Sequence, residues 1–142
     1  MDSILINTDG GARGNPGPSA IGVVIKTENG QVLAELSRNI GQTTNNVAEY
    51  AAVIEALKWL KSDKATKGQS DQIEIHFFLD STLVVNQLNG LFKVKEAHLR
   101  ELMFQVRRLE QEVKGNISYA YIPREKNQRA DYLVNKALDS RD

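Results

Sequence analysis

Short hydrophobic runs, separated by segments rich in glycine and polar residues, follow one another along the first forty residues of the chain. Residues 3–8, 20–27 and 31–40 are rich in β-branched and other aliphatic side chains, which favour strands. The sequence Glu28-Asn29-Gly30 between the second and third runs is typical of a hairpin turn. These three runs therefore predict an antiparallel meander.

Beyond residue 46 the apolar positions change to helical spacing. Residues 47–61 carry apolar side chains three and four positions apart, which predicts a helix after a polar loop at 41–46. A polar stretch at 62–71 predicts a surface loop. The remaining pattern predicts a strand at 73–79, a short helix at 83–88 closed near Gly90, a long amphipathic helix at 99–113, a strand at 117–122 and a last helix at 127–138.

This order, a meander followed by strands that helices separate, predicts an α/β fold. Helical crossovers favour parallel pairing, so the sheet should be mixed. The length of 142 residues fits one domain, and we expect residues 1–142 to form it.

Composition narrows the classes of function. The chain has no cysteine, which excludes disulfides, thiolate metal sites and cysteine nucleophiles. Lys and Arg total 18, as do Asp and Glu, so the formal net charge is zero and a polyanionic partner must be held by local patches. The sequence lacks an apolar stretch long enough for a membrane span and the pattern of a signal peptide, so the expected location is the cytoplasm.

Four acidic residues stand where a site can form. Asp9 follows the first predicted strand and precedes a loop rich in glycine and proline, and Asp80 follows the fourth predicted strand. Open sheets of this kind form sites at the carboxyl ends of strands. Glu49 and Asp131 lie at the margins of apolar helix faces, so both helices can direct a carboxylate along the sheet.

Each of these acids also has a purely structural interpretation. Asp9 and Asp80 suit turns at strand ends, and Asp131 suits the first turn of a helix. Glu49, three residues after Asn46, can complete a capping box. If all four converge, their repulsion requires divalent cations, and oxygen-only ligands suit Mg²⁺ or Mn²⁺. Two such ions about 4 Å apart can activate a water and stabilise a leaving oxygen in phosphodiester hydrolysis.

Four sequence blocks occur in an order that resembles the signature of type 1 ribonuclease H, and the resemblance covers essentially the whole chain. The blocks are Thr8-Asp9-Gly10-Gly11 with Gly14-Asn15-Pro16-Gly17, Thr43-Thr44-Asn45-Asn46-Val47-Ala48-Glu49, Leu79-Asp80-Ser81 and Arg129-Ala130-Asp131. The resemblance implies a ribonuclease-H-like fold, with a mixed five-stranded sheet in the order 3-2-1-4-5 and helices on both faces. It also implies a metal-dependent endonuclease that cuts the RNA strand of RNA/DNA hybrids by a two-metal-ion mechanism, leaving 5′-phosphate and 3′-hydroxyl ends.

On this resemblance, the catalytic metal-binding positions are those of Asp9, Glu49, Asp80 and Asp131. They would hold two Mg²⁺ ions when substrate is bound, with Mn²⁺ as a substitute. Glu49 would also lie near the RNA 2′-hydroxyl, the group that distinguishes RNA from DNA. Further contacts along the minor groove and backbone of the hybrid are expected from Gly14, Asn15, Thr44, Asn45, Asn46, Ser81 and Thr82. Helix capping is an alternative role for Asn45 and Asn46, and the two roles can coexist.

Three departures from the family pattern affect the expected site. Family members often carry a histidine before the fourth carboxylate, but the segment Ile122-Pro123-Arg124-Glu125-Lys126-Asn127 has none, and Glu125 is a hypothetical substitute. His76 and His98 are predicted to be structural or surface residues. The basic insertion of some members is absent after Gly90, and Thr82 stands where many relatives place glutamine. The candidate phosphate contacts are Arg13, Lys93, Lys95, Arg124, Lys126 and Arg129.

Two other functions stay open at this point. One is a module that binds the duplex without cutting it, although retention of four mutually repelling acids argues against it. The other is a nuclease that also cuts double-stranded RNA, since both duplexes present 2′-hydroxyls. We expect a monomer that requires neither a protein partner nor a membrane.

Overall fold

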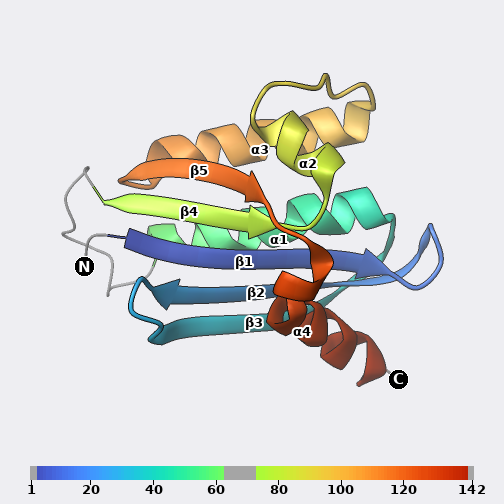
Figure 1. Ribbon diagram of the computed structural model, residues 1–142. Helices are drawn as coiled ribbons and strands as arrows, with labels where there is room; N and C mark the ends of the chain where they lie inside the picture. The colour runs from blue at the N-terminus through green and yellow to red at the C-terminus, as the bar shows by residue number, and fades with distance from the viewer. Residues whose placement is uncertain (1–2, 63–72, 141–142) are drawn as a thin grey trace.

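The structure, a computed structural model, describes residues 3–62 and 73–140. The strands of this part are β1 (Ser3–Ala12), β2 (Gly17–Thr27), β3 (Val32–Thr43), β4 (Glu74–Leu79) and β5 (Asn116–Tyr121). Its helices are α1 (Asn45–Ser62), α2 (Thr82–Leu88), α3 (Ala97–Glu112) and α4 (Gln128–Asp139), with the 3₁₀ turn η1 (Arg124–Lys126) before α4. The order of elements is the predicted one (Figure 1). The surface loop predicted at 62–71 lies outside the described residues, apart from Ser62, which ends α1.

The strands form a mixed sheet in the order β3-β2-β1-β4-β5. β1 pairs with β2, and β2 with β3, in antiparallel fashion, whereas β4 runs parallel to both β1 and β5. The predicted topology is therefore confirmed. It places β1 at the centre, between the meander and the parallel half.

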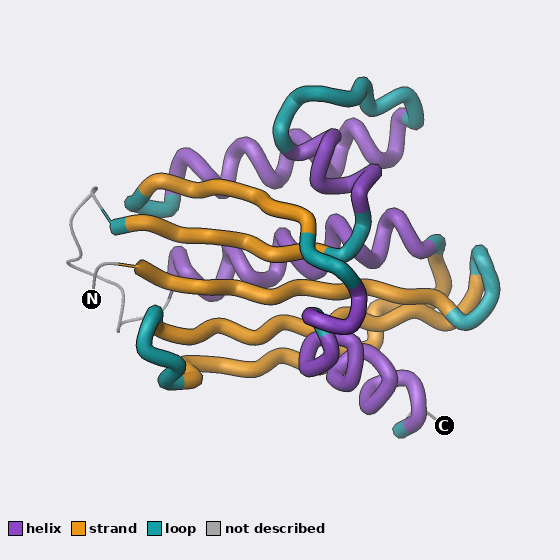
Figure 2. Tube along the Cα trace, viewed as in Figure 1, coloured by secondary structure: helices purple, strands orange, loops and turns teal. Residues whose placement is uncertain are grey.

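Helices cover both faces of this sheet, as Figures 1 and 2 show. α1 packs on β1 and β2 with α3 against it, while α4 packs on β2 and β3 from the opposite face. Among the described residues, none of the helices combines the length and the apolar character needed to cross a membrane.

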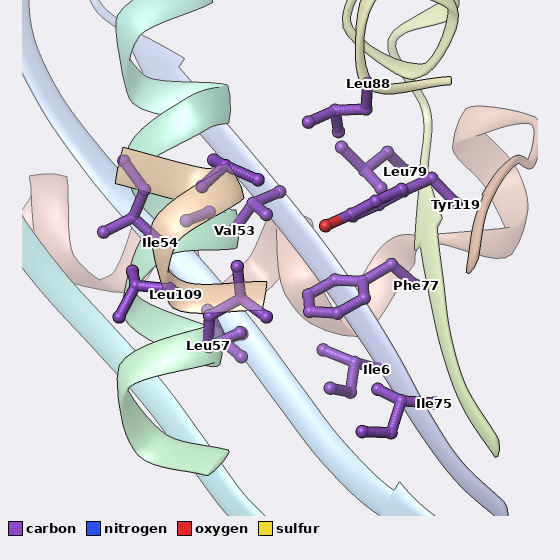
Figure 3. Close-up of a cluster of buried hydrophobic side chains, with 14 of the residues drawn as sticks. Ile6, Val53, Ile54, Leu57, Ile75, Phe77, Leu79, Leu88, Leu109 and Tyr119 are labelled. Atoms are coloured by element: carbon purple, nitrogen blue, oxygen red, sulfur yellow. The ribbon is translucent and has the colours of Figure 1, made fainter. Parts of the chain in front are cut away.

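Aliphatic and aromatic side chains fill the space between the sheet and helices α1 and α3 (Figure 3). Ile6 and Phe77 from the sheet and Leu57 from α1 are completely buried. The Phe77 ring lies 5.1 Å from that of Tyr119, centroid to centroid, in a tilted arrangement. Burial of each such side chain contributes about 1.5–3 kcal/mol, so this core holds α1 firmly over β1.

Three predicted strand boundaries are wrong, and all lie at the same end of the meander. β1 continues to Ala12, β2 begins at Gly17 and β3 continues to Thr43, so the first half of the predicted loop at 41–46 is strand. Continuous pairing, such as Asp9 opposite Gly22, satisfies the backbone hydrogen bonds of this extension. The glycines and prolines lower the local strand propensity, but the ladder with neighbouring strands overrides it.

The sequence analysis placed Asp9 at the end of the first strand. In the structure Asp9 lies within β1. The parallel ladder between β1 and β4 nevertheless stops at Asn7 opposite Phe78. Asp9 comes two residues after this last parallel pair, and Asp80 directly follows β4 at the same edge. Because parallel strands bring their carboxyl ends together, the two acids emerge side by side.

Gly10 lets α1 approach β1 closely enough to deliver Glu49. A Cβ atom at Gly10 would lie 2.2 Å from the carbonyl carbon of Ala48 and 2.5 Å from the backbone nitrogen of Glu49. On the other face, a Cβ atom at Gly22 would lie 2.1 Å from the carbonyl oxygen of Ala130 in α4. Both helices therefore rest directly on the backbone of the meander.

We expect Gly10→Ala to lower the free energy of unfolding by about 1–3 kcal/mol or more, because backbone atoms of α1 must move to admit the methyl group. Urea denaturation in the presence of EDTA measures this change. Gly11→Ala is the matched control, since a Cβ atom there would meet only the Val134 side chain, at 3.4 Å. Its effect should stay within about 1 kcal/mol. Equal stabilities of the two variants would contradict the importance of the close contact.

Candidate metal centre

Three carboxylates from separate elements converge at the edge where β1 and β4 emerge. One oxygen each of Asp9, Glu49 and Asp80 lies within 4.8 Å of the others. Asp9 is 7% exposed and Glu49 is 5% exposed, whereas Asp80 is half-buried. The fold thus brings together three of the four predicted site acids, and two of them are almost completely buried.

Backbone hydrogen bonds orient two of these carboxylates. The Gly10 N–H donates to Glu49 Oε1 at 2.7 Å and to Asp9 Oδ1 at 3.0 Å. Glu49 therefore turns toward the sheet, and the structure favours this arrangement over a capping box at the start of α1. Thr44 caps that helix instead, because its hydroxyl accepts the N–H of Val47 at 3.3 Å.

Asp131 lies in the first turn of α4 and lines the same cleft, of about 320 Å³, as the other three acids. Its N–H donates to the carbonyl oxygen of Asn127 at 3.1 Å. Its carboxylate is half-buried and is not one of the group that converges within 4.8 Å. Asp131 therefore lies outside this group of three, but its charge acts on Asp9, whose pKa it raises.

The cluster is electrostatically strained without a cation. Burial, followed by the charges of Asp80 and Asp131, raises the pKa of Asp9 to about 7. Burial and the charges of Asp9 and Asp80 raise the pKa of Glu49 well above its ordinary value. A divalent cation would relieve this repulsion, and a donor set made only of carboxylate oxygens suits Mg²⁺ or Mn²⁺. The residues present therefore fit a divalent metal site.

Asn15 and Asn45 tie the tip of the meander to the start of α1. Asn15 Oδ1 accepts the N–H of Asn45 at 2.9 Å, and Asn45 Oδ1 accepts the N–H of Ala12 at 2.8 Å. The side chain of Asn45 thus bonds to β1 and does not cap α1, which was the structural role considered from sequence. Asn45 and Asn46 also line the cleft, about one helical turn before Glu49 in α1.

The predicted substrate residues after β4 lie next to the cluster. Ser81 lines the cleft, and its hydroxyl caps α2 by accepting the N–H of Val84 at 3.2 Å. Thr82 is exposed at the first position of α2. An adjoining groove of about 550 Å³ begins at Asn46 and is lined by Leu83, Leu91, Phe92, Lys93 and Lys95, among others. The cleft and this groove share Asn46, so together they form one extended surface, which we call the cleft–groove surface.

The predicted basic residues divide into two groups. Arg13 and Arg124 line the cleft, although Arg13 also pairs with Asp139 at 2.6 Å. Arg129 instead forms two hydrogen bonds with Glu35, at 2.8 and 2.9 Å, which occupy its guanidinium. Lys126 is exposed in η1 and does not line the cleft.

The segment before α4 brings an arginine and no histidine to the cleft. Arg124 lines the cleft, whereas Glu125, the hypothetical substitute, is exposed beside it and does not. His76 lies on β4, where its Nδ1 is 2.8 Å from the Ser118 hydroxyl, and His98 is exposed at the start of α3. Neither histidine lines the cleft.

One buried polar residue beside the cluster was missed by sequence reasoning. Asn127 donates to Asp80 Oδ2 at 3.0 Å, yet from sequence it is only the first residue of the last helix. The available signal was an asparagine four positions before Asp131, which by itself suggests an ordinary helix cap.

Comparison with known proteins identifies the family. A family model described as reverse transcriptase-like matches residues 7–137. The structure of LC11-RNase H1, isolated from compost by a metagenomic approach, is 49% identical with a TM-score of 0.90, covering 98% of this chain and 97% of that one. The chain belongs to the type 1 ribonuclease H family.

Other ribonuclease H relatives agree with this assignment. The bifunctional protein Rv2228c of Mycobacterium tuberculosis is 41% identical over 138 residues, which cover 96% of this chain and 36% of that protein. Ribonuclease HI of Halobacterium salinarum is 41% identical over 133 residues, which cover 92% of this chain and 62% of that protein. The chain thus spans between about a third and two thirds of these curated relatives. LC11-RNase H1 has also been solved in complex with an RNA/DNA hybrid, at 48% identity and a TM-score of 0.89, covering 96% of each chain.

We expect Asp9→Asn to stabilise the metal-free ribonuclease H domain at pH 8. Between the ordinary pKa of 3.8 and the folded value of about 7, the folded protein holds a proton that the unfolded chain has lost. Stability therefore falls as the pH rises through this window, by at most about 4 kcal/mol from this carboxyl. Urea denaturation in EDTA should show the variant about 1–4 kcal/mol more stable than the wild type at pH 8, with a smaller gain at pH 5.

Asp139→Asn provides the control, because it removes a surface carboxylate paired with Arg13. It should change stability by less than about 1 kcal/mol at either pH. A loss of stability on Asp9→Asn at pH 8 would contradict repulsion within the cluster.

Proposed function

We propose that this chain is a metal-dependent endoribonuclease that hydrolyses the RNA strand of RNA/DNA hybrids and leaves 5′-phosphate and 3′-hydroxyl ends. The observation that carries the proposal is the convergence of Asp9, Glu49 and Asp80 within 4.8 Å, with Asp131 on the same cleft. The hybrid complex of LC11-RNase H1, at 48% identity, supports the choice of substrate. In this proposal residues 1–142 act as a single ribonuclease H domain.

Asp9, Glu49, Asp80 and Asp131 would hold the metal, Mg²⁺ or Mn²⁺ as its substitute. Two ions bound with substrate would supply an activated water and stabilise the leaving oxygen. The chain itself supplies a preformed donor set, because the Gly10 N–H already orients Asp9 and Glu49. The low exposure of these two acids keeps competing water away from their oxygens.

Recognition of the duplex would use the cleft–groove surface. Asn45 and Asn46 stand beside Glu49 on the cleft, where a minor groove that displays 2′-hydroxyls can approach. Lys93 and Lys95 line the groove beyond Asn46. This position suits them to contact phosphates of the DNA strand of the hybrid. Arg124 would supply a positive charge at the reacting end of the cleft, in place of the family's histidine.

A module that binds hybrids without cutting them is less well supported. Binding alone gives no reason to bury two acids and raise the pKa of both. Activity on double-stranded RNA belongs to the same proposal, since an A-form duplex also presents 2′-hydroxyls to this surface.

The proposal is tested with labelled RNA/DNA, RNA/RNA and DNA/DNA duplexes, each with Mg²⁺, Mn²⁺ or EDTA. We expect metal-dependent cleavage of the RNA strand of the hybrid and none of the DNA duplex. Asp80→Asn should reduce hybrid cleavage by at least about a hundredfold, because it removes one anionic ligand from the site. Circular dichroism verifies that this variant stays folded. Substantial cleavage by the folded variant would refute the assignment of the site.

The groove lysines should contribute to the salt dependence of hybrid binding. On B-DNA-like duplexes each phosphate neutralised adds about −0.9 to the slope of log K against log salt, so Lys93→Ala and Lys95→Ala should each make the slope shallower by about that amount. Fluorescence anisotropy with hybrid and Ca²⁺ in place of Mg²⁺ measures the slope. Lys114→Ala is the control, because Lys114 is exposed just before β5, at the end of the parallel strands opposite Asp80. A slope change in the control alone would contradict the proposed path of the duplex.

A further inference from the structure

Asn127 is a buried amide at the junction of η1 and α4, with 1% of its surface exposed. Its Nδ2 donates to the carbonyl oxygen of Thr8 at 2.9 Å and to Asp80 Oδ2 at 3.0 Å. Its Oδ1 accepts the side-chain N–H of Asn7 at 3.0 Å. Both donor hydrogens and the carbonyl oxygen of the amide are thus engaged, and one of these bonds goes to a carboxylate of the cluster.

The side chain of Asn127 is not used as a helix cap. Asparagine before a helix ordinarily turns its oxygen toward the N–H groups of the first turn. Asn127 precedes α4 but makes no such bond, and α4 starts with no side-chain cap. The amide turns instead toward β1 and Asp80, so its placement serves the sheet edge and not the helix.

Asn127 contacts all three segments that carry Asp9, Asp80 and Asp131. The side chain binds Asp80 directly, and its bond to Thr8 holds the backbone immediately before Asp9. The main-chain carbonyl of Asn127 accepts the N–H of Asp131 at 3.1 Å. The amide side chain thus joins Asp80 to the strand that carries Asp9, while the link to Asp131 is the first main-chain bond of α4.

The chemistry of an amide suits this task. A neutral donor restrains one oxygen of Asp80 while leaving lone pairs free for a cation. A lysine or arginine in the same place would bring a positive charge that competes with the metal. Residues that orient a ligand in this way commonly change metal affinity by 10–100-fold when they are removed.

We propose that Asn127 is a positioning residue that holds the Asp80 carboxylate in place and thereby sets the affinity of the site for divalent cations. The inference rests on the proposed function, in which Asp80 is a metal ligand. It adds a residue outside the four acids to the machinery of metal binding.

A variant at Asn7 distinguishes this positioning role from a purely structural one. Asn7→Ala breaks the bond between Asn7 Nδ2 and Asn127 Oδ1, yet it leaves the bonds from Asn127 to Thr8 and Asp80 in place. Asn127→Ala removes all three. If the amide only stabilises the fold, both variants should affect unfolding and neither should affect metal binding specifically.

The test is isothermal titration of Mn²⁺ alone into the wild type, Asn127→Ala, Asn7→Ala, Asp80→Asn and the Asn127→Ala/Asp80→Asn double variant, with thermal unfolding in EDTA measured in parallel. We expect Asn127→Ala to weaken Mn²⁺ binding about 10–100-fold and Asn7→Ala to change it less than about twofold. In the Asp80→Asn background, Asn127→Ala should weaken binding no further, because the carboxylate that it positions is gone.

Unchanged Mn²⁺ affinity in Asn127→Ala, or equal weakening in Asn7→Ala, would overturn the inference while leaving the proposed function intact. A folded wild type that binds no Mn²⁺ would overturn the proposed function itself, and the inference with it. If Asn127→Ala does not fold, Asn127→Ser takes its place in the series. The serine hydroxyl stops one bond short of the amide nitrogen, so the same weakening is expected.

Discussion

The close contact between α1 and β1 at Gly10 is the constraint on which the site depends. With no Cβ at this position, the backbone of Ala48 lies directly on the strand, and the Gly10 N–H reaches both Glu49 and Asp9. A helix held further away would leave the carboxylate of Glu49 short of the strand edge. The aliphatic core between the sheet and α1 supplies the free energy that keeps the helix there.

That contact has an electrostatic cost, and in a ribonuclease H the same charges would bind metal ions. Asp9 and Glu49 are buried together, and the pKa of each is raised by burial and by neighbouring carboxylates. Both shifts disfavour the ionised carboxylates in the metal-free fold, and a divalent cation would relieve their repulsion. Functional sites commonly carry local strain that the rest of the structure supports, and here the core does so.

Much of the architecture could be predicted from the sequence, because hydrophobic periodicity reports which side of each element is buried. The order of elements and the mixed sheet followed from that periodicity, and the strand order from the resemblance to the family. The ends of the meander did not follow. Glycine and proline between residues 10 and 18 indicated a loop, whereas pairing with β2 carries β1 on to Ala12. Local propensity contains no information about a neighbouring strand that satisfies the same backbone groups.

The sequence by itself determined which acids are available, which family the chain resembles and that no histidine precedes Asp131 in its segment. Only the tertiary structure decided which polar residues line the cleft or bond to these acids. Arg129 looked equivalent to Arg124, but it pairs with Glu35, 94 residues away, while Arg124 lines the cleft. Asn127 resembled a helix cap, yet it bonds to Thr8, 119 residues away. Contacts between residues so distant in the chain follow no local periodicity, so they become visible only when the sheet brings its strands together.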